Sequence, residues 1–154
     1  MHIPATPQPL LPPIDFDVAN NYTSMRSTID RLQRWLEPGR MPSSAAYFVI
    51  LTVEEMVCRC IRFGYQDEKE HRIAVSVTHS AADVTVRIVD DAVPYNPNVE
   101  RAPFEGPPLD RRRTEGLGMV IVRAISSEIL YSRDGESNVS TFRKRIRNLG
   151  FPES

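Results

Sequence analysis

The sequence has almost no net charge. Its 154 residues include 19 Lys and Arg against 20 Asp and Glu, which gives a formal net charge of −1 at pH 7. A protein with this balance has no overall electric field to draw it to nucleic acid or to an anionic membrane surface. We therefore expect neither nucleic acid nor membrane as a direct partner, and any binding must come from a local site.

Cysteine and histidine are scarce. Two cysteines, Cys58 and Cys60, lie two residues apart in a predicted helix, where their side chains point in different directions and cannot easily form a disulfide. Free thiols are typical of a reducing cytosol. The three histidines, His2, His71 and His79, have no metal-site spacing around them. We therefore predict free cysteines and no metal-binding cluster.

Long apolar runs are missing as well. No stretch reaches the length that spans a bilayer, and the N-terminus lacks the basic segment and apolar core of a signal peptide. The content of 41% hydrophobic and 25% charged residues is that of an ordinary globular domain, and the length suffices for one core. These features predict a single cytoplasmic domain.

Proline is plentiful in two regions. Five prolines fall within residues 1–13, which predicts a flexible proline-rich tail. Five more fall within residues 91–115, where no periodicity is visible, and a loop this long in a compact domain is usually functional or disordered. The folded domain is therefore expected over residues 14–147, followed by a short C-terminal tail over 148–154.

The remaining sequence alternates between strand and helix patterns. Strands are predicted at 14–18, 73–77, 84–89, 129–132 and 139–146, and helices from about 25 to 36, 43 to 63 and 117 to 126. Asn20 or Asn21 is expected to cap the first helix, Ser43 or Ser44 the second, and Asp134-Gly135 to form a hairpin turn. This order favours an α+β fold, a two-layer sandwich with a mixed, mainly antiparallel sheet and helices on one face.

A glycine pair precedes the last predicted helix. Gly116 and Gly118 are expected in a flexible loop that leads directly into an apolar helical pattern. Small residues let backbone amides approach an anion, and the start of a helix adds partial positive charge. The loop is a candidate phosphate site, although a glycine pair before a helix is more often only a turn.

Two other stretches complete a known pattern. Residues 53–65 predict a helix with acidic and basic residues on one face, and residues 84–95 predict a strand that ends in two carboxylates. In this order and spacing, the three stretches resemble the nucleotide-binding boxes of the GHKL ATPases, which share the Bergerat or histidine-kinase-like ATPase fold. Over roughly residues 14 to 147, the chain looks most like the anti-sigma-factor serine/threonine kinases of bacterial partner-switching systems.

The resemblance implies ATP as the ligand, with residues 91–115 as its lid. Gly116, Leu117 and Gly118 would then hold the phosphates, and the run Arg111–Arg113 could meet them too. Glu55 would position or deprotonate the attacking nucleophile.

The same resemblance places adenine beside Asp90. Its carboxylate would accept a hydrogen bond from the exocyclic amine, and Thr141 would lie near it on the last strand. Ala92 stands where the family has a glycine, so its methyl group puts the affinity for the base in doubt. The alternative for Asp90 is a solvated turn after a strand.

Arg59 departs from the family at the position of the asparagine that holds Mg²⁺. A guanidinium has five donors and no acceptor, so it cannot ligate a metal, and Mg²⁺ is doubtful. Three alternatives are open. Arg59 could form an ion pair with Glu55 while the pocket binds no nucleotide, or it could donate hydrogen bonds to phosphate oxygens. In the third, Mg²⁺ is held by phosphates and water alone. Pairing would lower the pKa of Glu55 and make it a poorer proton acceptor. Phe63, at the position of a family histidine, is expected to pack under the sheet.

Two classes of function remain open. The chain is either a kinase that transfers the γ-phosphoryl group of ATP to a partner protein, or a pseudokinase that sequesters its partner without phosphorylating it. The resemblance implies a sigma factor or an anti-sigma antagonist as the partner, a possible homodimer, and a role in transcription regulation.

Overall fold

The computed structural model describes residues 10–37, 39, 41–99 and 111–146. The strands are β1 (Ile14–Ala19), β2 (Arg72–His79), β3 (Asp83–Asp90), β4 (Glu128–Asp134) and β5 (Ser137–Arg145). The helices are α1 (Tyr22–Leu36), α2 (Ser43–Arg59) with the π-helix η1 (Cys60–Gly64) directly after it, and α3 (Arg111–Ile125). The expected tail at 148–154, most of the tail at 1–13 and residues 100–110 of the expected lid lie outside the described residues.

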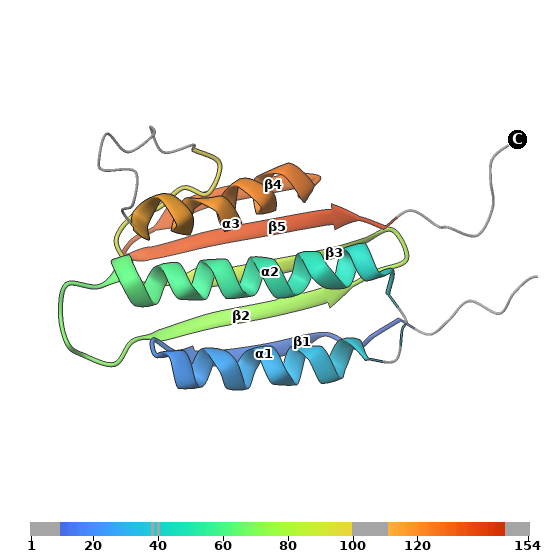
Figure 1. Cartoon of the computed structure of the whole chain (residues 1–154), viewed down its shortest axis with the longest axis horizontal. Helices are drawn as coiled ribbons and strands as arrows, with labels where there is room; N and C mark the ends of the chain where they lie inside the picture. Colours follow the sequence, from blue (N-terminus) through green and yellow to red (C-terminus); the bar gives the residue numbers. More distant parts are fainter. Residues whose placement is uncertain (1–9, 38, 40, 100–110, 147–154) are drawn as a thin grey trace, which may run out of the picture.

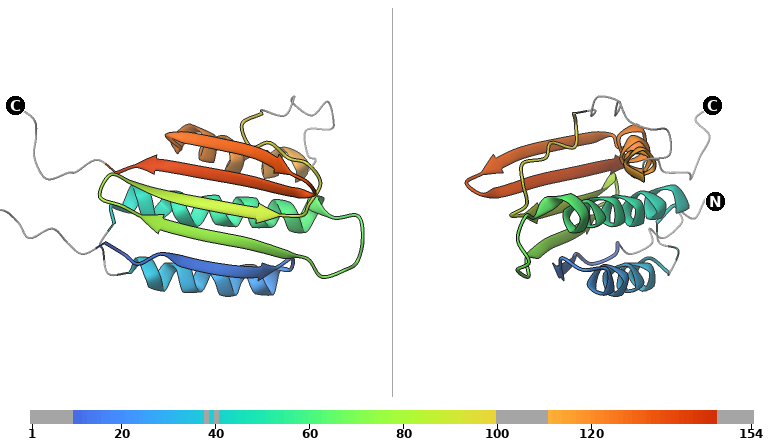
Figure 2. Two further views of the ribbon diagram at one scale, coloured as in Figure 1. Left: turned by 180° about the vertical axis from the view of Figure 1, so that it is seen from behind. Right: turned by 60° about the vertical axis from the view of Figure 1, so that its left-hand side comes forward.

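The five strands form one sheet in the order β1-β2-β3-β5-β4. Helices α1, α2 and α3 lie side by side on one face of it (Figure 1), and the view from behind shows the other face without a described helix (Figure 2). The predicted two-layer α+β sandwich is thus confirmed. Every pairing between the described strands is antiparallel, so the sheet is not mixed.

The core lies between the helix layer and the sheet. Each central strand alternates buried and more exposed residues, as a strand with one covered face must, and α2 is buried along most of its length. The fully covered side chains include Ile73, Val75 and Val77 on β2, Val84, Val86 and Ile88 on β3, and Phe48, Val49, Val53 and Val57 on α2. This packing fixes the end of α2 against the end of β3.

The element boundaries show how local chemistry acts. Asn21 caps α1 as predicted, because its side-chain oxygen accepts from the backbone N–H of Ser24 at 2.8 Å. The serine cap predicted for the second helix is wrong, since Pro42 holds the N-cap position without a side-chain cap bond. The last hairpin turns at 135–136, one residue later than expected, with Gly135 at φ 60°.

The end of the expected N-terminal tail is docked on the domain. Leu11 is buried, and its backbone N–H donates to Nδ1 of His79 at 3.1 Å. The Nε1–H of Trp35 donates to the carbonyl of Pro12 at 3.0 Å. The chain is therefore anchored before β1 begins. Among the helices of the described part, none is both long and apolar enough to cross a membrane.

Candidate functional site

A small pocket lies between the end of α2 and the loop after β3. Its lining residues are Met56, Arg59, Cys60, Phe63 and Gly64 on the helix side, and Asp90, Ala92, Val93, Tyr95 and Asn138 on the sheet side. The cavity volume is about 20 Å³, and the pocket is partly open to solvent. Three of the predicted site residues, Arg59, Asp90 and Ala92, come together here.

Asp90 is a buried, fixed acceptor at this pocket. It is only 4% exposed, and its Oδ1 accepts from the backbone N–H of Ala92 at 3.0 Å and from Nδ2 of Asn138 at 2.8 Å. Burial raises the pKa of the neighbouring Cys60 thiol, and the charge of Asp90 and its hydrogen bond raise it further. The alternative of a solvated turn at Asp90 is therefore wrong. Cys58 and Cys60 are both free, as predicted.

Asn138 on β5 is a site residue that the sequence reasoning missed. Its Nδ2 donates to Asp90 Oδ1 and to the carbonyls of Ala92 and Val93, while its Oδ1 accepts from the hydroxyl of Tyr131. The side chain is 2% exposed. A polar residue at an inward position of an alternating strand is expected to be buried and hydrogen-bonded. That pattern, with Phe142 inward on the same strand, could have identified it.

Ala92 packs against Gly64 on the helix side of the pocket. A Cβ added to Gly64 would lie 2.9 Å from the Cβ of Ala92, and the N–H of Val93 donates to the carbonyl of Gly64 at 2.9 Å. The glycine of this contact is therefore on η1 instead of on the strand end. π-Helical turns inside helices are found frequently at functional sites.

Arg59 reaches across the pocket to Tyr95. Its guanidinium carbon lies 3.4 Å from the centroid of the Tyr95 ring and 5.9 Å from that of Phe63, so the cation lies on aromatic faces. The lining position of Phe63, which is 38% exposed, contradicts the expectation that it packs under the sheet. Phe63 lies one turn after Arg59 and therefore on the pocket side of the helix.

Glu55 has a raised pKa, whereas pairing with Arg59, one of the three alternatives, would have lowered the pKa. Burial raises the pKa most, the charge of Glu54 raises it further, and Arg62 is the cation that lowers it. Arg59 is directed to the aromatic rings, and a carboxylate that is partly desolvated binds its proton more tightly. Glu55 is thus a better proton acceptor than an ordinary surface glutamate.

The glycine pair lies inside α3 and not in a loop before it. The helix begins at Arg111, and amides beyond its first four residues bond to carbonyls of the preceding turn. The amides of Gly116 and Gly118 therefore do not form the predicted phosphate cradle. Leu117 is 61% exposed on the same helix. The side chains of 111–115, with the run Arg111–Arg113, lie outside the described part.

Gly118 instead makes room for Glu55. A Cβ at Gly118 would overlap the carboxyl group of Glu55, whereas one at Gly116 would meet nothing within 4 Å. The carboxylate of α2 thus lies directly against the backbone of α3. Two predicted site residues, Glu55 and Gly118, are therefore in contact, and the contact is one of close packing between the helices.

Thr141 does not lie beside Asp90. In the sheet Asp90 pairs with Asn138, while Thr141 pairs with Arg87 and Leu130. Because side chains alternate along a strand, a shift of three residues places Thr141 on the opposite face from Asn138. The predicted role of Thr141 at adenine is therefore wrong.

The pocket combines one buried carboxylate, that of Asp90, with one guanidinium, that of Arg59. Asp90 offers a buried acceptor for an exocyclic amine. Arg59 places positive charge where the resemblance expects a metal ligand, and no group of three or more His, Cys, Asp or Glu in the described part could hold a metal ion.

Comparisons with known proteins show the family and the fold of the chain. No curated protein matches the chain. Among solved structures, a crystal structure of the RsbU and RsbW domains of Rv1364c from Mycobacterium tuberculosis has the same fold, with a TM-score of 0.60 and 16% sequence identity. The match covers 88% of this chain and 32% of that one, so the chain spans about a third of its length. Residues 18–144 match the family described as histidine kinase-like ATPase domain, and the chain belongs to that family.

Proposed function

We propose that this chain is a regulator of the anti-sigma, partner-switching type that acts by binding a partner protein, with little or no phosphoryl transfer. The observation that carries the proposal is Arg59, which stands where the resembled family has its metal-holding asparagine and whose guanidinium lies on the Tyr95 ring. Phosphoryl transfer depends chiefly on positioning and on metal ions that neutralise developing charge. A guanidinium supplies charge but cannot ligate the metal.

The partner class follows from two similarities. The sequence resembles anti-sigma-factor kinases, and a structure with an RsbW domain shares the fold. We therefore expect the partner to be a sigma factor or an anti-sigma antagonist. The resemblance also allows a homodimer, and we expect the protein to act in the cytoplasm. ATP is expected to bind through its base at Asp90, with no requirement for Mg²⁺.

An active serine/threonine kinase is the second candidate. The observation in its favour is Glu55, whose raised pKa would suit a residue that accepts the proton of a substrate hydroxyl. Transfer by this route would need Arg59 to leave Tyr95 and Mg²⁺ to be held by phosphates and water.

A phosphorylation assay on the captured partner separates the two candidates. Proteins that co-purify from the native host are incubated with the wild type, ATP labelled at the γ-phosphate, and Mg²⁺. The proposal predicts a stable complex without label transfer. Label transfer that needs Mg²⁺ and is abolished by Glu55→Gln would establish the kinase instead.

A further inference from the structure

Two side chains that line the pocket at Asp90, those of Arg59 and Tyr95, contact each other. Arg59 extends from α2 on one wall, and Tyr95 extends from the loop after β3 on the other. The distance of 3.4 Å between the guanidinium carbon and the ring centroid is that of groups in van der Waals contact. With this stack in place, the guanidinium and the ring join the two walls of the pocket that they both line.

Both partners of the stack are held in position. The backbone N–H of Tyr95 donates to Oδ1 of Asn138 at 3.3 Å, and Asn138 is in turn bonded to Asp90. On the helix side, Phe63 lies one turn after Arg59, and its ring centroid is 5.9 Å from the guanidinium carbon. The cation therefore lies near two aromatic rings, in the pocket that the buried carboxylate also lines.

We propose that the Arg59–Tyr95 stack is a plug of the base site, and that a purine enters only when the guanidinium leaves the Tyr95 ring. The inference rests on the proposed function in one respect, because it takes the pocket at Asp90 as the base site. Arg59 then controls access, and the apparent affinity for the base is reduced by the fraction of molecules in which the plug is closed.

Adenosine titration tests the plug without phosphates or metal. Since adenosine has no phosphate, any attraction between Arg59 and the triphosphate is absent. Arg59→Ala should bind adenosine about 5- to 30-fold more tightly than the wild type, which corresponds to the ~1–2 kcal/mol typical of a cation on an aromatic face. Calorimetry measures both affinities directly.

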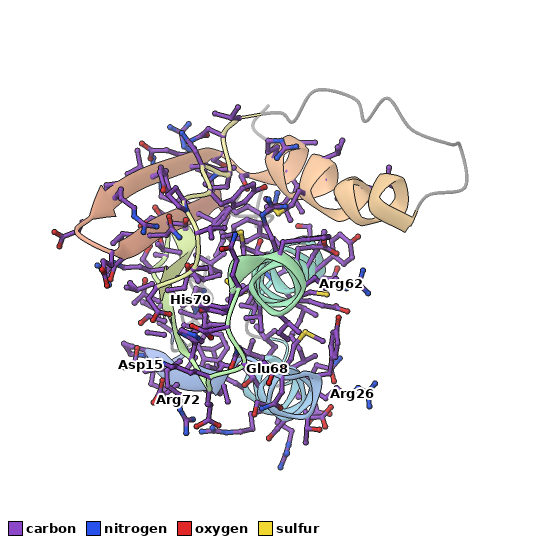
Figure 3. All side chains as sticks on the ribbon, turned by 90° about the vertical axis from the view of Figure 1, so that its left-hand side faces the viewer. Asp15, Arg26, Arg62, Glu68, Arg72 and His79 are labelled. Atoms are coloured by element: carbon purple, nitrogen blue, oxygen red, sulfur yellow. The ribbon has the colours of Figure 1, made fainter. Side chains whose placement is uncertain are left out.

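Arg62→Ala is the matched control. Arg62 lies three residues further along the same helical segment, but its Nε–H donates to the hydroxyl of Tyr22 at 2.8 Å. Figure 3 shows its side chain projecting outward from the helix layer, away from the sheet. Its removal should leave adenosine affinity unchanged. Four results would each overturn the plug. Arg59→Ala could bind adenosine no more tightly than the wild type, bind it more weakly, or not bind it at all. Arg62→Ala could also show the same gain as Arg59→Ala.

Side-chain NMR of the wild type tests the stack without any variant of Arg59. The ring current of Tyr95 should shift the Nε–H proton of Arg59 upfield, and saturating adenosine should remove that shift. Tyr95→Leu should also remove it. An unshifted resonance in the wild type, or one that adenosine leaves in place, would overturn the plug.

The plug and the proposed function fail separately. Mg²⁺-dependent phosphorylation of the partner by the wild type would overturn the proposed function, but a gain of adenosine affinity in Arg59→Ala would still support the plug. A stable unphosphorylated complex without that gain would overturn the plug alone.

Discussion

Asn138 holds Asp90 and the loop after β3 in place, so its substitution tests the frame of the pocket. Asn138→Asp would lose the donor to Asp90 Oδ1 at 2.8 Å and put a second carboxylate beside it. We expect a loss of about 2–4 kcal/mol in unfolding free energy at pH 7. Part of this should return at pH 5, because two adjacent carboxyl groups share a proton readily.

Urea unfolding at both pH values measures this effect. Thr141→Ala, on the other face of β5, is the control and should cost less than about 1 kcal/mol. Equal losses in the two variants would show that Asn138 is an ordinary strand residue.

Gly118 and Gly116 form a matched pair on α3. Either Gly→Ala change should add up to about 1 kcal/mol of helix stability, but only a Cβ at Gly118 meets Glu55. The carboxylate lies at the end of a flexible side chain, so we expect Gly118→Ala to displace it toward water and to lower the pKa of Glu55. In Gly116→Ala the raised pKa should persist.

Carbon-13 NMR titration of the Glu55 carboxyl group gives this pKa directly. An identical pKa in the two glycine variants would contradict the close contact between Glu55 and α3.

At the scale of elements, η1 packs against the end of β3 through the close contact between Gly64 and Ala92. Gly64→Ala would bring two Cβ atoms to 2.9 Å, and neither can rotate away. We expect a loss of about 1–3 kcal/mol in unfolding free energy, as for other overpacked sites. Ala92→Gly in the same chain should restore most of it. The double-mutant cycle, measured by urea unfolding, would show no coupling if the contact were not made.

His71 joins the loop after η1 to the end of β3. Its Nδ1 lies 3.0 Å from Asp91 Oδ2 and its Nε2 lies 2.7 Å from Asp67 Oδ1. The hydrogen bond to Asp91, and then that to Asp67, raise the pKa of His71. Because the pKa of His71 is higher in the folded state than in the unfolded state, where it is about 6.5, protonated His71 stabilises the fold. This stabilisation is complete at pH values below about 6.5 and is lost as the pH rises through the folded pKa.

We therefore expect His71→Gln to cost more stability at pH 6 than at pH 8.5. His79 is the control, because burial lowers its pKa, and His79→Gln should not show this dependence. Thermal unfolding across this range measures both, and a cost of His71→Gln that is constant with pH would contradict the bridge.

The elements themselves could be predicted where periodicity and caps agreed. Asn21 and the alternating strands marked α1, β2 and β3 closely. The start of α3 at Arg111 could not be predicted, because Gly116 and Gly118 both weigh against a helix. Gly118 is explained only by the packing of Glu55 against it, which the sequence does not show. Tertiary contact overrode local preference there.

For the whole molecule, the order of elements and the three boxes were enough to predict the fold and its family. The interior of the site was not predictable in the same way. The partner of Arg59 depends on the path of the loop that carries Tyr95, and the face of Thr141 depends on strand register. The path of the loop and the strand register are both properties of the assembled sheet. They cannot be inferred from the spacing of residues along the chain.

The central claim is that Arg59 stands in place of a metal ligand, and calorimetric titration of ATP with and without Mg²⁺ tests it most directly. The wild type should bind ATP equally well in both conditions, while Arg59→Asn should bind more tightly when Mg²⁺ is present, because an amide oxygen can ligate the metal. ATP binding by the wild type that requires Mg²⁺ would contradict the account.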